Sequence, residues 1–165
     1  KNHACEHKSN FNKIKLFLSD VDGVLTDAGM YYTENGDEFK KFCTYDGMGF
    51  HLLQKTGIKV GILTTEDRQL NRRRAKKLAL DFDFHGAKDK LQIVKDLCLK
   101  ENITLDEVAY IGDDVNCFSL LSHVGIAACP NNAVHKIKAI PNIIQLNKNG
   151  GDGVVREFVE LILKE

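Results

Sequence analysis

The stretch IKLFLSDVDGVLTD, residues 14–27, largely decides the fold of this chain. Its first part, Ile14 to Leu18, is mostly apolar and predicts a strand buried inside a sheet. Asp20 and Asp22 follow directly, two residues apart. Two carboxylates this close repel each other unless a cation or a proton lies between them. The stretch therefore predicts a buried strand that ends in a charged site.

Strand-like apolar runs alternate with helix-like segments along the rest of the chain. Further strands are expected at residues 58–63, 82–84, 108–111, 126–128 and 143–146, and helices at 47–55, 68–78, 90–100, 116–122, 133–138 and 154–164. This alternation predicts an α/β fold, with a central parallel sheet flanked by helices. Residues 29–42 break it. Aromatic and β-prone residues stand there on both sides of Asn35-Gly36, and they predict a protruding β-hairpin after the first strand.

Composition limits the class of protein. Of the 165 residues, 43% are hydrophobic and 28% are charged, which suits one soluble domain and excludes a disordered chain. Lys plus Arg and Asp plus Glu both number 23, so no net field attracts nucleic acid or an anionic membrane. No apolar run approaches the ~20 residues of a membrane span. The five cysteines include no CxxC pair, which favours reduced thiols and a cytoplasmic location.

We expect a single domain at residues 13–165, preceded by a flexible N-terminal tail at residues 1–12. The last part of the domain, residues 150–165, joins a glycine-rich segment to a closing helix. The tail contains His3, Cys5 and His7, whose side chains can bind soft metals. One short polar run without a second group of ligands predicts no metal site, so we assign the tail no function.

Polar residues follow several predicted strands. Thr64 ends the second strand, Lys90 opens the helix after the third, and the run GDDVN follows the fourth at residues 112–116. Ligands of an open parallel sheet bind beyond the carboxyl ends of its strands, so these groups are expected at one edge, together with Asp20 and Asp22. Helix caps and turns explain any one of them. They do not explain two acidic pairs on separate strand ends.

This set resembles the four motifs of the haloacid dehalogenase superfamily of phosphotransferases, in content and in order: DVDGVLT at residues 20–26, Thr64, Lys90 and GDDVN at residues 112–116. The resemblance covers residues 14–165 and implies a Rossmann-like core. It implies that Asp20 is a nucleophile that forms an aspartyl-phosphate, and that Asp22 protonates the leaving group and then activates water. Thr64 and Lys90 would hold the phosphoryl oxygens.

The same resemblance implies Mg²⁺ as the cofactor. The ion would be bound by Asp20, by the backbone carbonyl of Asp22 and by Asp113. Two further polar residues, Asp114 and Asn116, would support these ligands without binding the ion themselves. Cys117 departs from the pattern, since many members of the superfamily carry an acidic residue there. We expect this difference to alter the surroundings of the metal and not to abolish the site.

Neither segment between the motifs is long enough for a separate cap domain. The hairpin and one helix use residues 23–63, and one helix and a short strand use residues 65–89. A site without a cap is open to water, so another part of the protein must close it. The hairpin is the internal candidate, because its β-prone strands could pair with copies in other subunits. Alternatively, the hairpin is a surface element that does not pair with other subunits.

One capless branch, the tetrameric phosphatases of 2-keto-3-deoxy sugar acids, is similar in four segments: the hairpin, FCTYDGMG at residues 42–49, RRR at 72–74 and GGDGVVRE at 150–157. This resemblance implies a small-molecule sugar acid phosphate as substrate, and a homotetramer with a site shared between subunits. Three consecutive arginines spread around a helix, so they cannot all face one ligand. By similarity, Arg74 is expected to bind the substrate carboxylate, with Thr44 nearby.

The substrate of this branch has eight or nine carbons. Octulosonate phosphatases usually carry Gly-Arg after the threonine of the second motif, whereas this chain has Thr65-Glu66, which is similar to the nonulosonate branch. Lys77 is similar to a second residue of that branch. A carboxylate and an ammonium could bind the extra hydroxyls, although both residues could equally be exposed helix charges. We expect a nonulosonate 9-phosphate as the preferred substrate and octulosonate 8-phosphate as the next.

Two other classes of protein share part of the pattern. A receiver domain of signalling proteins also places carboxylates, a threonine and a lysine at a sheet edge, but its acidic pair and its phosphoacceptor lie on different strands. A catalytically inactive module, used for assembly in sialic-acid-activating enzymes, shares the fold. The first residue of this chain is not Met, which is compatible with fusion to such an enzyme. Such a module can lose its catalytic carboxylates, yet all of them are present here.

Overall fold

A six-stranded parallel sheet forms the centre of the molecule in the computed structural model, which describes residues 10–164. Its strands are β1 (Leu16–Ser19), β4 (Lys59–Leu63), β5 (Phe82–Phe84), β6 (Val108–Ile111), β7 (Ile126–Cys129) and β8 (Ile144–Gln145). They lie in the order β5-β4-β1-β6-β7-β8. Strand β1 pairs in parallel with β4 on one side and with β6 on the other. The predicted fold class is therefore confirmed, with the motif-bearing strand at the centre.

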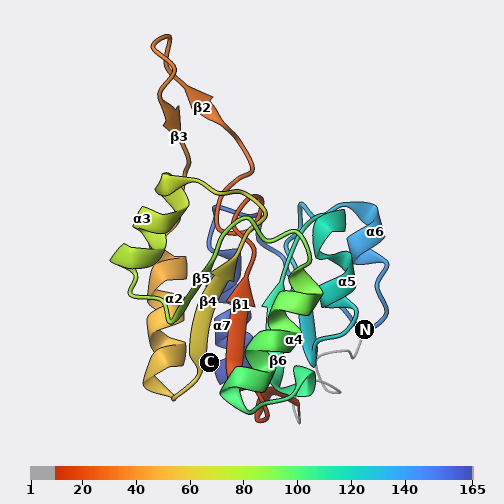
Figure 1. Cartoon of the computed structure of the whole chain (residues 1–165). Helices are drawn as coiled ribbons and strands as arrows, with labels where there is room; N and C mark the ends of the chain where they lie inside the picture. Colours follow the sequence, from red (N-terminus) through yellow and green to blue (C-terminus); the bar gives the residue numbers. More distant parts are fainter. Residues whose placement is uncertain (1–9, 165) are drawn as a thin grey trace.

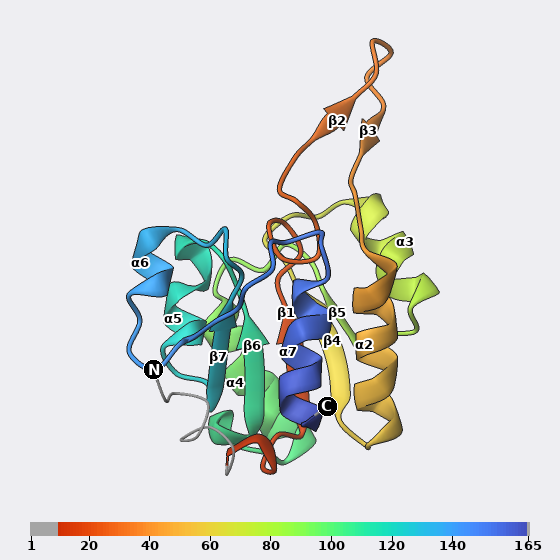
Figure 2. The ribbon, with the colours of Figure 1, turned by 180° about the vertical axis from the view of Figure 1, so that it is seen from behind.

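Helices cover both faces of the sheet (Figure 1 and Figure 2). They are α2 (Thr44–Lys55), α3 (Gln69–Lys77), α4 (Lys90–Glu101), α5 (Phe118–Leu121), α6 (His135–Lys138) and α7 (Val154–Leu163). Side chains of β1 alternate between the faces. Phe17 packs in the core formed with α2 and α7, where its ring centroid lies 5.9 Å from that of Phe50 and 5.3 Å from that of Phe158. Leu16 and Leu18 pack in the second core, with α4, α5 and α6.

The predicted β-hairpin is present and stands away from the body of the molecule (Figure 1). Strand β2 (Tyr31–Tyr32) pairs antiparallel with β3 (Glu38–Phe39). Gly36 lies in the turn with a φ of 89°, a conformation that glycine adopts without steric cost. A bridge between Thr26 and Phe42 joins the two ends of the hairpin segment. Several aromatic side chains of the hairpin are exposed to solvent.

Several predicted element boundaries are shifted by one to three residues in the structure, among them those of α2 and α5. Helix α2 begins at Thr44, before the predicted start at Gly47, because two glycines belong inside it and permit close packing. A Cβ on Gly49 would lie 3.4 Å from the Cα of Arg156 in α7. The single helix predicted at residues 116–122 is instead a 3₁₀ turn, η2 (Val115–Cys117), followed by α5, and the turn starts early because the Asp114 carboxylate accepts a hydrogen bond from its first backbone amide.

Residues 1–9 lie outside the described part of the chain, so the predictions for His3, Cys5 and His7, and for all of the tail except residues 10–12, concern residues that are not described. Phe11 is buried and packs in the same core as Phe17. Another short 3₁₀ helix, η1 (Leu105–Glu107), precedes β6. Within residues 10–164, no helix is both long and apolar enough to cross a membrane.

Replacing Phe17 by Ala tests the central position of β1. Its side chain is fully buried between two helices, so the substitution removes apolar contacts and leaves a cavity. We expect a loss of about 3–5 kcal/mol in the free energy of unfolding, measured by urea denaturation. Phe17→Leu keeps more of the volume and serves as the control, with a smaller loss. A loss below about 1 kcal/mol for Phe17→Ala would contradict this packing.

Candidate active site

The carboxyl end of β1 holds Asp20 in a fixed position. The backbone amide of Asp20 donates to the carbonyl of Ile111 at the end of β6, over 3.0 Å. Its Oδ1 atom accepts a hydrogen bond of 2.8 Å from the amide of Val21. Only 4% of the residue is exposed. The carboxylate is thus held at the sheet edge and largely removed from water.

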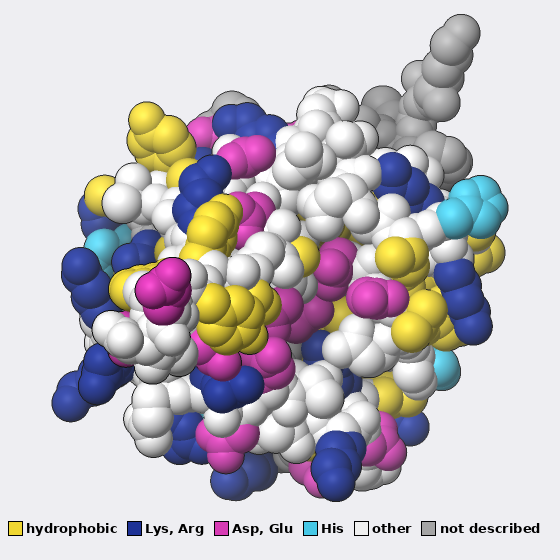
Figure 3. All heavy atoms as spheres, turned by 90° about the horizontal axis from the view of Figure 1, so that it is seen from above, with side chains coloured by type: hydrophobic (Ala, Val, Ile, Leu, Met, Phe, Trp, Pro, Cys, Tyr) yellow, Lys and Arg dark blue, Asp and Glu magenta, His cyan; other side chains and the backbone are white. Residues whose placement is uncertain are grey.

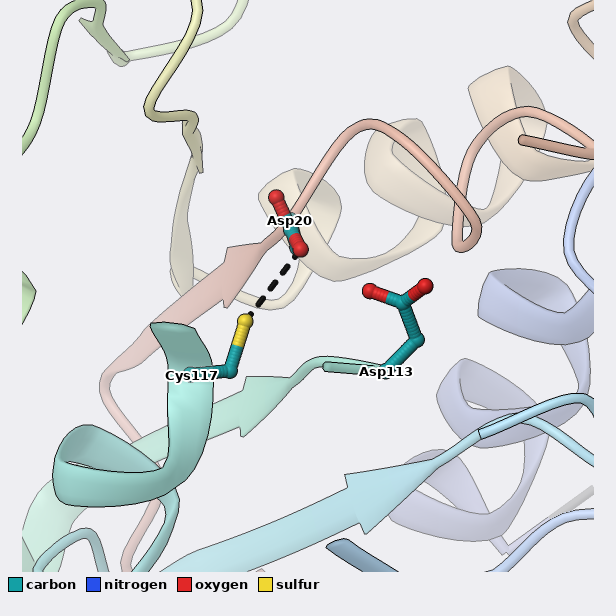
Figure 4. Close-up of side chains that lie close together, drawn as sticks. All are labelled: Asp20, Asp113 and Cys117. Atoms are coloured by element: carbon teal, nitrogen blue, oxygen red, sulfur yellow. Dashed lines mark hydrogen bonds between the residues drawn. The ribbon is translucent and has the colours of Figure 1, made fainter. Parts of the chain in front are cut away.

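Asp113 lies next to Asp20 because β6 and β1 are neighbours (Figure 4). Burial, together with the negative charge of Asp20, raises the pKa of Asp113 to about 8. Gly23 has a φ of 78°, and a Cβ there would lie 1.9 Å from Oδ2 of Asp113, so only glycine leaves room for this carboxylate. A cation between the two carboxylates would remove their repulsion. Oxygen donors of this kind fit Mg²⁺.

Lys90, the first residue of α4, supplies a positive charge beside this pair. Its buried Nζ lies 3.3 Å from Oδ1 of Asp20, 3.4 Å from the hydroxyl of Tyr110 and 3.5 Å from Sγ of Cys117. Burial alone favours the neutral amine, but the charges and hydrogen bonds of Asp20 and Cys117 outweigh it and raise the pKa of Lys90. The side chain is therefore an ammonium at neutral pH.

A cavity of about 210 Å³ opens at this edge of the sheet. Most of the predicted catalytic and metal-binding residues line it: Asp20, Asp22, Thr64, Asp113, Asp114 and Asn116, together with Ala28, Thr65 and Glu66. Figure 3, which looks down on the face that carries the hairpin, shows acidic side chains gathered near the middle of that face, beside apolar ones. The structure therefore brings the motif residues of three separate segments to one hollow.

The hydroxyl of Thr64 points into the loop that follows β4. Its Oγ1 atom accepts a hydrogen bond of 3.2 Å from the amide of Glu66, and the residue is buried.

Asp114 and Asn116, which also line the cavity, are both held by hydrogen bonds. The carboxylate of Asp114 caps η2, and Nδ2 of Asn116 donates to Oγ1 of Thr65 over 3.1 Å. The sequence predicted that Asp114 and Asn116 support the metal, and that role stays a prediction.

Lys40 forms the least expected contact of the site. It follows β3 at the base of the hairpin, and its Nζ lies 2.8 Å from Oδ1 of Asp22 and 2.7 Å from Oε2 of Glu66. Only 1% of the Lys40 side chain is exposed. Burial raises the pKa of Asp22, an effect that the Lys40 ammonium opposes, and the same ammonium lowers the pKa of Glu66. Lys40 does not stand out in the sequence, because a lysine pair after a hairpin strand is typical of an exposed edge.

The remaining residues predicted to bind substrate lie outside the cavity lining. Arg74 on α3 lies over the ring of Phe42, with its guanidinium carbon 5.5 Å from the ring centroid, and its Nη2 is 3.5 Å from the carbonyl of Cys43. That carbonyl directly precedes Thr44, so the predicted closeness of Arg74 and Thr44 agrees with these contacts. Lys77 is exposed on the same helix. Within one copy of the chain, these three side chains do not meet the catalytic carboxylates.

Comparison with known proteins identifies the family. The model of the haloacid dehalogenase-like hydrolases matches residues 84–158. The 3-deoxy-D-manno-octulosonate 8-phosphate phosphatase of Haemophilus influenzae is 32% identical over 158 residues, which cover 95% of this chain and 87% of that protein. This chain belongs to the haloacid dehalogenase-like hydrolases. The phosphatase of the same name from Escherichia coli K12 is 34% identical over 151 residues, which cover 91% of this chain and 79% of that protein.

Solved structures of this hydrolase family are similar over nearly the whole chain. The 3-deoxy-D-manno-octulosonate 8-phosphate phosphatase of Moraxella catarrhalis, in complex with magnesium, phosphate and the sugar acid KDO, has a TM-score of 0.91 and 36% identity, and the alignment covers 96% of this chain and 91% of that one. The cobalt-bound Haemophilus influenzae enzyme has a TM-score of 0.87 and 32% identity, with 94% and 90% coverage. The predicted family, class of enzyme and magnesium cofactor are confirmed by these relatives.

Replacing Lys40 by Met tests whether its ion pairs hold the site together. The change leaves two carboxylates facing each other without the ammonium that lies between them. We expect a loss of about 1–3 kcal/mol in the free energy of unfolding, measured by urea denaturation at neutral pH.

The adjacent Lys41 provides a matched control. Its Nζ lies 2.9 Å from Oδ1 of Asp152, but both side chains are half exposed, and exposed pairs contribute about 0–1 kcal/mol. Lys41→Met should therefore have little effect. Equal losses for the two variants would show that burial of Lys40 adds nothing.

Proposed function

We propose that this hydrolase is a Mg²⁺-dependent phosphatase that removes the terminal phosphate monoester of a 2-keto-3-deoxy sugar acid through an aspartyl-phosphate on Asp20. The observation that carries the proposal is the placement of Asp20, buried beside Asp113 and the Lys90 ammonium at the mouth of the cavity. The relatives named above support the substrate class, since they are phosphatases of an octulosonate 8-phosphate.

In the first step, the Asp20 carboxylate attacks phosphorus while the bond from phosphorus to the sugar oxygen breaks. The Lys90 ammonium offsets the repulsion between the carboxylate and the phosphate dianion, and the Thr64 hydroxyl offers a hydrogen bond to a phosphoryl oxygen. Mg²⁺ bound by Asp20, Asp113 and the Asp22 carbonyl would supply positive charge at the phosphoryl group. The sugar oxygen takes its proton from the carboxyl group of Asp22.

In the second step, the Asp22 carboxylate removes a proton from water. The water oxygen bonds to phosphorus, and the bond from phosphorus to Asp20 breaks, which restores both aspartates. Lys40 holds the Asp22 carboxylate at the cavity, through its contact of 2.8 Å. A single aspartate thus acts as acid and then as base, because it faces the same oxygen position in both steps.

The nine-carbon substrate is favoured by Glu66. Its side chain lines the cavity beside Asp22, where Lys40 fixes its orientation, and a fixed carboxylate can accept hydrogen bonds from sugar hydroxyls. The relatives favour the eight-carbon substrate instead. We propose a nonulosonate 9-phosphate as the preferred substrate and octulosonate 8-phosphate as the second.

We also propose that the active unit is a homotetramer. Exposed apolar side chains gather on and near the hairpin: Met30, Tyr31, Tyr32, Phe39, Tyr45 and Met48. A neighbouring subunit that covers them would bring its own Thr44, Arg74 and Lys77 towards the cavity. This arrangement accounts for predicted substrate-binding side chains that lie outside the cavity of their own chain.

Asp20→Asn tests the covalent mechanism, because an amide cannot form the acyl-phosphate. We expect turnover of octulosonate 8-phosphate and of an aryl phosphate, with saturating Mg²⁺, to fall by a factor of about 10⁴ or more. Asp96→Asn, on the exposed face of α4, is the control and should keep normal activity. Normal turnover by Asp20→Asn would exclude Asp20 as the nucleophile.

Parallel kinetics on the two sugar acid phosphates test the choice of substrate. We expect a higher kcat/KM for the nonulosonate 9-phosphate, and a fall of about tenfold in that value for Glu66→Gln, since one good hydrogen bond to a charged group contributes about 1.5–3 kcal/mol. The value for octulosonate 8-phosphate should change less. A much larger kcat/KM of the unmodified enzyme for the eight-carbon ester would reverse the assignment.

A further inference from the structure

We propose that Cys117 adds a sulfur ligand to the metal site, so that soft divalent cations such as Zn²⁺ and Cd²⁺ bind to Asp20, Asp113 and Cys117 together and exclude Mg²⁺. The inference rests on the metal site of the proposed function and extends it to a second class of ion. Such ions would inhibit the enzyme, because they would take the place of Mg²⁺ at the carboxylates of Asp20 and Asp113.

The three side chains lie close together at the ends of neighbouring elements, with the sulfur of Cys117 directed at Asp20 (Figure 4). One ligand atom from each lies within 4.8 Å of the other two. In a tetrahedral site with a metal–sulfur bond of about 2.3 Å and metal–oxygen bonds of about 2.1 Å, neighbouring ligand atoms lie roughly 3.6 Å apart. The Sγ of Cys117 already lies 3.2 Å from Oδ2 of Asp20. Small rotations of Asp113 and Cys117 are therefore enough to enclose an ion.

Burial and the negative charge of Asp20 raise the pKa of the Cys117 thiol to about 12, so the sulfur keeps its proton until a soft ion takes the place of that proton. The thiol of Cys117 donates to Asp20, while the Tyr110 hydroxyl donates to the sulfur over 3.1 Å and the Lys90 ammonium lies 3.5 Å from it. When a soft ion binds, the thiol proton leaves to solvent and the sulfur bonds to the metal in place of the hydrogen. The two donors remain, and hydrogen bonds of this kind hold a metal ligand in place.

The chemistry of the donor set separates the two classes of ion. Mg²⁺ is a hard ion that prefers oxygen, so it uses the carboxylates of Asp20 and Asp113 and leaves the thiol neutral. A soft ion also binds the sulfur of Cys117. Among the residues that the structure describes, no other cysteine belongs to such a group of ligands. The sulfur of Cys117 is therefore what allows the second class of ion to compete with Mg²⁺.

The test is direct observation of a metal–sulfur bond. Cys5→Ser is introduced first in every variant, because Cys5 and its neighbouring histidines could bind metal by themselves. Cd²⁺ is then titrated into the intact protein, and the sulfur-to-metal charge-transfer absorption in the ultraviolet is recorded. We expect the band in the Cys5→Ser background, its loss on Cys117→Ser, and a fall of about tenfold or more in Cd²⁺ affinity.

Two further variants control for structure. Cys129→Ser removes another buried cysteine, in β7, and should keep the band and the affinity. Cys117→Asp replaces sulfur by oxygen and should abolish the band while Mg²⁺ binding, followed by competition with Cd²⁺, persists. A band that survives Cys117→Ser, or equal Cd²⁺ affinity with and without Cys117, would overturn the proposal. Failure to hydrolyse sugar acid phosphates would instead contradict the proposed function and leave the absorption band unaffected.

Discussion

The repulsion between Asp20 and Asp113 is the constraint on which the rest of the site depends. Two adjacent central strands end in carboxylates, and burial makes the charge on both costly, as the raised pKa of Asp113 shows. Lys90 compensates for one of these charges from α4, and a cation is the natural partner of the other. Gly23 gives the second carboxylate its space. Binding of metal and phosphate would thus turn the unfavourable closeness of the two carboxylates into a favourable arrangement.

The fold was predictable because each strand carries its own pattern. The alternation of Phe17 with Leu16 and Leu18, and the polar residues that follow β1, β4 and β6, agree with the geometry of parallel sheets. Lys40 was not predictable, because its burial depends on how the hairpin leaves the sheet. No local pattern distinguishes it from Lys41, which is half exposed although it is the next residue.

The start of α2 shows a second limit of sequence reasoning. Glycine lowers helix propensity, so a local argument places the helix boundary at Gly47. Tertiary packing outweighs that cost, because the missing Cβ of Gly49 lets α7 approach α2 closely and the missing Cβ of Gly47 leaves room for the side chain of Leu78. Cys117 differs again: its position in the motif was evident, but its contacts with Asp20, Lys90 and Tyr110 required the folded chain. Tertiary contacts decided all of these positions.

The ion pair between Lys40 and Asp22 also reduces the conformational freedom of the hairpin segment. It joins two residues that are 18 positions apart, and the Thr26–Phe42 bridge joins the same two branches of the chain. The hairpin is therefore a closed loop anchored at both ends and not a free arm, and most of the entropy of closing it is already lost within one subunit. Any surface that receives the exposed aromatic side chains of β2 and β3 meets an ordered strand pair, which lowers the entropic cost of association.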